Sequence, residues 1–151
     1  MVKPVSAEFQ DFVLELETAT PGTFAKICGI TSRGISRQTN LQSSSTPRDC
    51  EDESLPLEVK KSVESSEVSM TATGTWASQS HEMMLDWWYS GAKKNVRLYH
   101  ANAAVGDTEY ETGGAYLTSL GNEVEKGQAV TASIEIQFDG VPTRTAKVEA
   151  P

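Results

Sequence analysis

The stretch GGAYLTSLGNEVEKGQAVTASIEIQFDGVPT, residues 113–143, decides how this chain folds. Its second half alternates between two sets of side chains, of which the apolar set is Val130, Ala132, Ile134, Ile136 and Phe138. A period of two residues places such a set on one face of an extended strand. Residues 115–120 alternate similarly, residues 121–127 supply a turn, and Asp139-Gly140 ends the second strand. We therefore expect a long antiparallel hairpin with one face on a core.

Shorter segments on both sides of this hairpin carry the same signal. We expect further strands over residues 10–17, 24–30, 35–42, 67–76, 95–101 and 143–148. One segment has a different period, because Met84, Trp87, Trp88 and Gly91 recur at helical spacing. We expect a single α-helix over about residues 79–91, which ends at Gly91. At 151 residues the chain is too short for two comfortable domains, so residues 1–151 are expected to form one mainly β domain.

A polar segment interrupts the pattern at residues 43–56, SSSTPRDCEDESLP. It has no apolar period, and loops of this length in a compact domain are usually functional or disordered. We expect a protruding loop within the domain that contacts a neighbouring subunit; the alternative is a solvated acidic loop without a partner. The loop residues expected at such an interface are Arg48, Asp49, Glu51, Asp52 and Glu53. The basic residues expected to pair with its acids across the interface are Arg33, Arg37, Lys60 and Lys61.

Charge and composition exclude several functions. The formal net charge is −8, with 13 basic and 21 acidic residues, which argues against tight nucleic-acid binding but allows a surface that DNA passes without sticking. No run is long enough to span a bilayer and the first residues do not resemble a secretory leader, so we expect no membrane anchor. Cys28 and Cys50 share no ligand spacing with His81 or His100, so we expect no metal site. We expect both thiols to be reduced, because the sequence shows no export signal.

Catalytic motifs are missing from the sequence. Gly113-Gly114 lacks the helix and lysine of a phosphate-binding loop, and the sequence has no Gly-x-Ser-x-Gly and no His-Glu-x-x-His. We expect no catalytic site, no cofactor and no enzyme activity. The aromatic run Trp87, Trp88 and Tyr89 leaves two interpretations open: a contact patch for a partner, or packing of at least one tryptophan into the core.

The order of these elements resembles the major tail tube proteins of long-tailed bacteriophages and gene transfer agents. The resemblance covers residues 8–143. It rests on five segments: residues 24–29 (FAKICG), 46–54 (TPRDCEDES), 87–91 (WWYSG), 114–119 (GAYLTS) and 130–140 (VTASIEIQFDG).

The resemblance implies a β-sandwich of antiparallel strands with one flanking helix. It also implies hexameric rings that stack into the tail tube of a virion, through which DNA passes into the host without specific binding. The partners would be other copies of the chain together with tape measure, tail terminator and baseplate proteins, and assembly would occur in the cytoplasm of the bacterial host. The alternatives are a tail terminator, a contractile-tail inner tube, or a small intracellular binding module that uses Trp87, Trp88 and Tyr89.

Overall fold

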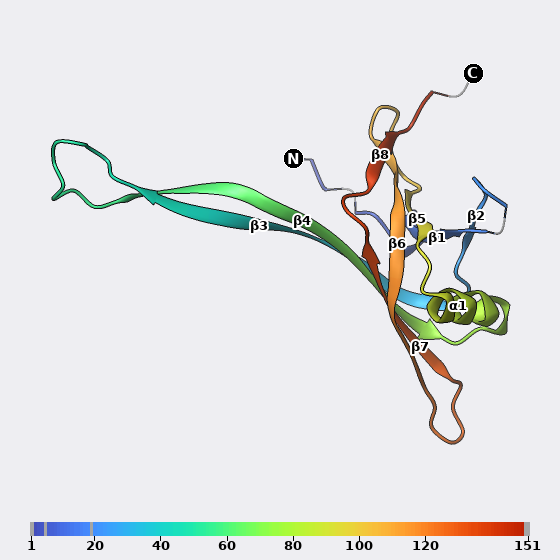
Figure 1. The fold of residues 1–151 in the computed structure, drawn as a ribbon. Coiled ribbons are helices and arrows are strands. Elements are labelled where there is room, and N and C mark those ends of the chain that lie inside the picture. Colours follow the sequence, from blue (N-terminus) through green and yellow to red (C-terminus); the bar gives the residue numbers. More distant parts are fainter. Residues whose placement is uncertain (1, 5, 19, 150–151) are drawn as a thin grey trace.

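The structure is a computed structural model, which describes residues 2–4, 6–18 and 20–149. It is mainly β with one α-helix, as the sequence predicts, and every strand pair is antiparallel (Figure 1). In chain order the elements are η1 (Phe9–Asp11), β1 (Phe12–Glu17), β2 (Phe24–Lys26), β3 (Ile30–Thr46), β4 (Glu58–Thr75), α1 (Ser78–Ser90), β5 (Lys94–His100), β6 (Thr108–Glu123), β7 (Thr131–Phe138) and β8 (Thr143–Ala146).

Strand β6 joins two halves of one continuous sheet, whose order is β2-β1-β5-β6-β7-β4-β3. In the first part of β6, residues 110–115 pair with β5, and residues 108–112 pair with β8 on the other edge. The second part, residues 115–123, pairs with β7. The expected hairpin of residues 113–143 is therefore present, and it connects the two halves.

The two halves of the sheet share one hydrophobic core, as expected of a sandwich. Leu14 and Leu16 of β1 belong to the same buried cluster as Met70 of β4 and Ile136 of β7. Leu16, Met70 and Ile136 are fully buried. A fully buried aliphatic side chain contributes about 1.5–3 kcal/mol relative to an exposed one. The polar alternate positions of β7, from Thr131 to Gln137, stay on the exposed or half-exposed face, as the two-residue period predicts.

Helix α1 lies at one side of the body (Figure 1) and buries Met84 and Trp87 in the core. The Trp87 indole Nε1–H donates a hydrogen bond to the Ala92 carbonyl at 2.9 Å. Trp88 and Tyr89 are 47% and 77% exposed, so only one of the two tryptophans is a core residue. The helix ends at Gly91, whose φ of 63° is the left-handed C-cap conformation that glycine favours.

The start of β3 differs from the expected single strand over residues 24–30. Strand β2 ends at Lys26, and the chain then turns through Gly29, which has a φ of 91°. Gly29 lies directly against Gly74 of β4: a Cβ atom added at Gly74 would stand 2.2 Å from the Gly29 carbonyl oxygen. A Cβ atom added at Gly29 would stand 2.4 Å from the Thr75 carbonyl oxygen. Both positions at this crossing therefore need glycine, because a side chain at either would overlap backbone atoms of the facing segment.

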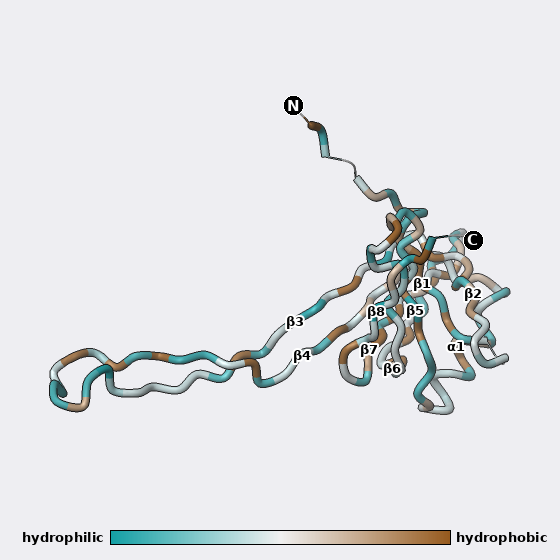
Figure 2. Tube along the Cα trace, turned by 90° about the horizontal axis from the view of Figure 1, so that it is seen from above, coloured by the Kyte–Doolittle hydropathy of each residue, from teal (hydrophilic) through white to brown (hydrophobic). Residues whose placement is uncertain are grey.

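The most prominent feature is a two-stranded arm that extends far from the body (Figure 1, Figure 2). Strands β3 and β4 pair over almost their whole lengths, but β4 pairs with β7 only from Ser69 onward. We define the arm as residues 38–67, its tip as residues 47–57, and its root as the region where it leaves the body.

The arm changes the boundaries of the expected polar loop. Residues 43–46 pair with residues 58–61 and extend β3, so the unpaired segment is 47–57 and not 43–56. Serine and threonine hydroxyls are compatible with an exposed strand. Residues 43–46 have no apolar period, and for this reason the sequence predicted a loop. In the structure they are hydrogen-bonded to residues 58–61 as a strand pair.

The contact between Gly29 and Gly74 predicts a large difference between two glycine substitutions. Gly74→Ala should lower the free energy of unfolding by about 2 kcal/mol or more, because β3 and β4 must move apart. Gly34→Ala is the matched control on the same strand pair, since its nearest neighbour would be the Thr71 hydroxyl at 3.9 Å. Urea unfolding of both variants would check this, and equal stabilities would contradict the described contact.

Adjacent tryptophans should also differ in their importance. Trp87→Ala removes a buried side chain and should cost about 3–5 kcal/mol of the free energy of unfolding. Trp88→Ala removes a side chain that is half exposed and should cost less than about 1 kcal/mol. Thermal and urea unfolding of the two variants would measure the difference. A larger loss of unfolding free energy for Trp88→Ala than for Trp87→Ala would contradict the described orientation of α1.

Candidate assembly site

The arm presents two chemically different faces. Leu41 is paired with Val63, and Val59, four pairs further out, shares their face because residues two apart on a strand point the same way. The pair Ser43–Lys61 lies between them on this face. Leu41 is 52% exposed, Val63 is 64% exposed and Val59 is 56% exposed. The pairs on the opposite face are polar, among them Gln42 with Ser62 and Ser44 with Lys60. A subunit by itself therefore leaves an apolar stripe on the arm uncovered.

The acidic residues at the tip have a local structural role. The Asp49 carboxylate accepts a hydrogen bond from the Glu51 backbone N–H at 2.9 Å, and Asp52 accepts one from the Ser54 backbone N–H at 3.0 Å. These bonds shape the turn of the tip. The Ser54 hydroxyl and backbone N–H lower the pKa of the Asp52 carboxyl, because both bonds favour its charged form.

The residues predicted for the interface fall into two groups. Arg48, Asp49, Glu51, Asp52 and Glu53 lie in the tip, and Lys60 and Lys61 lie on the adjoining part of β4. Arg33 and Arg37 lie on β3 near the body and are engaged within the subunit. The Arg33 guanidinium donates hydrogen bonds to the carbonyls of Phe12 and, at 2.7 Å, Phe9, and it lies over the Phe9 ring. The expected pairing of Arg33, Arg37, Lys60 and Lys61 with the tip acids of another copy stays a prediction.

An ion cluster fixes the root of the arm to the other half of the sheet. Arg37 of β3 donates two hydrogen bonds to the Glu111 carboxylate of β6, one of them from Nε at 3.1 Å. His100 Nε2 of β5 lies 2.9 Å from the same carboxylate. Burial of Glu111 by itself raises the pKa of its carboxyl. The hydrogen bonds from Arg37 and His100 together with their charges outweigh this effect, and the pKa lies below its ordinary value of 4.5.

The apolar stripe of the arm and the partners of Arg37 were not predicted from the sequence. The alternation of Leu57, Val59 and Val63 was a signal for the stripe, but polar residues dominate the segment around it. Glu111 carried no such signal. It stands in an ordinary alternating strand, and its role depends on β3 crossing over β6 from a distant part of the sequence.

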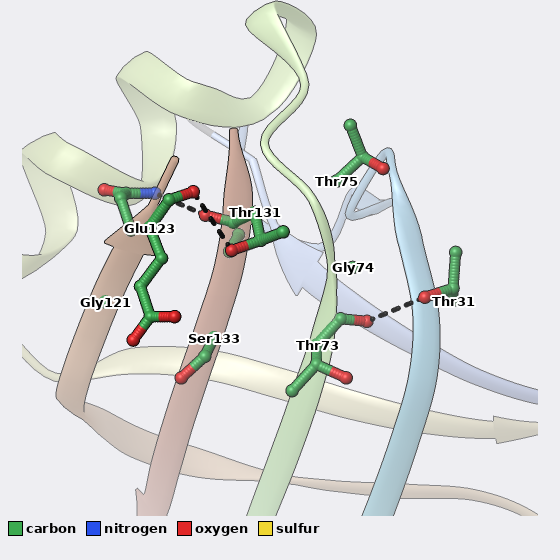
Figure 3. Close-up of a pocket in the computed structure, with 10 residues that line it drawn as sticks. Thr31, Thr73, Gly74, Thr75, Gly121, Glu123, Thr131 and Ser133 are labelled. Carbon is green, nitrogen blue, oxygen red and sulfur yellow. Dashed lines mark hydrogen bonds between the residues drawn. The ribbon is translucent and has the colours of Figure 1, made fainter. Parts of the chain in front are cut away.

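A polar hollow of about 510 Å³ lies across the ends of β3, β4, β7 and β6 (Figure 3). Thr31, Thr73, Thr131 and Ser133 are among the residues that line it. The Thr131 hydroxyl donates to the Glu123 carbonyl at 3.1 Å, and the Thr31 hydroxyl donates to the Thr73 carbonyl at 3.4 Å. Its one carboxylate, Glu123, has no acid–base partner in the lining. This hollow therefore offers no arrangement for catalysis.

Two further classes of site can be assessed for the residues that the structure describes. None of their His, Cys, Asp and Glu side chains form a group of three that could hold a metal ion. No helix among them has the length and apolar character needed to cross a membrane. Within the same residues Cys28 and Cys50 are free and exposed.

The ion cluster at the root predicts how acid affects stability. The folded pKa of Glu111 is lowered, so its stabilising contribution is complete above the unfolded pKa and is lost as the pH falls through the folded pKa. Arg37→Met should lower the free energy of unfolding at neutral pH by about 1–3 kcal/mol, because a buried carboxylate loses its main donor. The variant should also lose part of the acid dependence.

Urea unfolding between neutral pH and about pH 3 would measure both effects. Arg48→Met removes an arginine from the exposed tip and serves as the control for the change in net charge. An Arg37→Met variant with the stability and pH dependence of the wild type would show that the cluster does not contribute to the stability of the fold.

Solved structures with the same fold come from tails and related assemblies. A chain of the tail of an empty gene transfer agent particle, a structure with C6 symmetry, is 14% identical and has a TM-score of 0.74. The match covers 93% of this chain and 100% of that one. A chain of the SPP1 tail tube is 15% identical, with a TM-score of 0.68 and coverage of 95% and 81%.

A third structure belongs to the baseplate of the anti-feeding prophage. It is 13% identical, has a TM-score of 0.59, and the match covers 97% of this chain and 98% of that one. At these identities the likeness shows a common fold. A search of curated proteins gives no match.

The family assignment rests on the sequence as well. Residues 6–144 match the family described as phage tail tube protein, and the matched region includes the arm, the helix and both halves of the sheet. This agrees with the expected absence of enzyme activity, since the family is a structural one. The chain therefore belongs to the phage tail tube protein family.

Proposed function

We propose that six copies of this chain form a ring and that the rings stack into the tube of a phage tail. The observation that carries the proposal is the match of residues 6–144 to the tail tube family in a chain whose arm extends beyond the body. The C6 symmetry of the gene transfer agent tail with the same fold supports rings of six. The tube would be a virion component, assembled in the cytoplasm of the bacterial host, that conducts DNA during ejection.

The arm is the part of the subunit that fits an assembly role. A two-stranded ribbon is at best marginally stable in water without a third strand or a covering partner. Both long edges of the arm are open beyond Ser69, since the sheet order places β3 at the end and β4 leaves β7 at that residue. A neighbouring copy that covers the apolar stripe of Leu41, Val59 and Val63 would stabilise the ribbon. The arm would therefore become ordered on assembly.

The acidic composition suits a conduit for DNA. A net charge of −8 per copy gives roughly −48 for six copies, and such a field repels a polyanion at distances within the Debye length. DNA would then pass without specific binding. Tape measure, tail terminator and baseplate proteins are the proposed further partners, at the inside and the two ends of the tube.

Electron microscopy of the concentrated protein would test this function. The wild type should form tubes, whereas a tail terminator would form single rings and a small binding module would stay monomeric. The inner tube of a contractile tail would also appear as a tube, and only the presence of a sheath in the virion separates it. A protein that stays monomeric at high concentration, with tail components added, would overturn the proposal.

Replacement of the arm tests its role separately. A variant in which a short Gly-Ser link replaces residues 40–65 should fold, because the core residues lie outside the arm. Its far-ultraviolet circular dichroism should show the body strands and helix, while tubes should disappear from the micrographs. Long tubes formed by this variant would show that the arm is dispensable for stacking.

A further inference from the structure

A groove of about 510 Å³ opens at the root of the arm. Its apolar wall is formed by Val68 of β4 together with Val141 and Pro142, which precede β8. Val141 is 64% exposed. The polar wall contains Arg37, Glu111 and His100, which belong to the ion cluster, and Arg144 of β8. The groove thus combines an exposed apolar surface with basic side chains.

Arg144 gives this groove a surplus positive charge. The single carboxylate in the lining, Glu111, is already bonded to Arg37 and His100. Among the ion pairs of the described residues none includes Arg144, and its side chain is exposed. In a chain with a net charge of −8, a concave site with an uncommitted guanidinium is suited to an acidic occupant.

The tip of the arm has the complementary composition. Arg48 against Asp49, Glu51, Asp52 and Glu53 is one positive against four negative charges, or −3. Leu55 and Leu57 follow directly and are 41% and 58% exposed. An acidic segment beside two exposed leucines matches a groove that has a free arginine beside Val141 and Pro142.

The geometry of the arm excludes the subunit's own tip as the occupant. Strands rise about 3.3 Å per residue, so the stretch from Arg37 to Thr46 places the tip roughly 30 Å from the root. Figures 1 and 2 both show the tip far from the body. The occupant that matches the groove in charge and apolar surface is then the tip of a second copy. Such a contact is head-to-tail, because each subunit uses its tip on one side and its root on the other, and contacts of this kind either close into a ring or continue along an axis.

We propose that the arm tip of one copy docks in the groove at the arm root of a second copy, where Arg144 receives a tip carboxylate. This inference rests on the proposed tube function and identifies the receptor for the arm. Leu55 or Leu57 would lie against Val141 and Pro142, and the ion cluster of Arg37, Glu111 and His100 would hold the groove wall in place.

Charge exchange between tip and groove tests the contact. Arg144→Glu should abolish tubes, and so should the tip variant Glu51→Lys/Glu53→Lys, whereas the combination of all three changes should restore them. Lys126→Glu, in the exposed turn between β6 and β7, makes the same charge change elsewhere and should leave tubes intact. Electron microscopy and pelleting would score each variant, with circular dichroism to show that each is folded.

The docking site and the tube function can fail independently in these experiments. Tubes formed by the wild type and equally by Arg144→Glu would overturn the docking site while the tube function stands. Loss of tubes in Arg144→Glu without recovery in the combined variant would also overturn it. A wild type that forms no tubes would refute the tube function and the docking site with it.

Cross-linking gives an independent test that uses the native Cys50 of the tip. In a Cys28→Ser background, Thr108→Cys places a thiol in the groove lining, and Ser90→Cys places one on α1 as the control. Mild oxidation of tubes should produce covalent dimers and longer chains with Thr108→Cys, and markedly fewer with Ser90→Cys. Equal cross-linking of the two variants, or none with Thr108→Cys in intact tubes, would contradict docking in this groove.

Discussion

The double pairing of β6 is the constraint on which the other elements depend. One strand supplies hydrogen bonds to β5 and β8 along its first part and to β7 along its second part, with a register shift between Leu117 and Ser119. Because both halves of the sheet use the same strand, their buried faces meet in one core. The core in turn fixes α1 through Met84 and Trp87. A change that shifts the register of β6 would therefore move both halves at once.

The root of the arm depends on this arrangement as well. Glu111 lies on the first part of β6 and Arg37 on β3, and these strands are separated by β7 and β4 in the sheet order. They meet only because the sheet folds over at β6. The arginine–carboxylate pair thereby connects the fold of the body to the direction in which the arm leaves it. Fold and assembly surface are thus coupled through a contact that no local pattern encodes.

The sequence predicted those parts of the molecule in which neighbours along the chain decide the structure. The period of residues 129–138, the helix before Gly91 and the mainly β class are of this kind, and they are confirmed. It did not predict that residues 43–46 form a strand, because three of their four partners in 58–61 are charged and no core selects a face. It also did not predict that Arg37 would bind Glu111, since that contact depends on the fold of the whole chain.

The direction of the arm has a consequence for polarity. The arm leaves the body on one side only, so any stack that uses it has two chemically distinct ends. In the docking that we propose, one end would present free acidic tips and the other would present empty grooves with their arginines. No single capping protein can bind both ends in the same way. Such a polymer would therefore be initiated and terminated by partners with different surfaces.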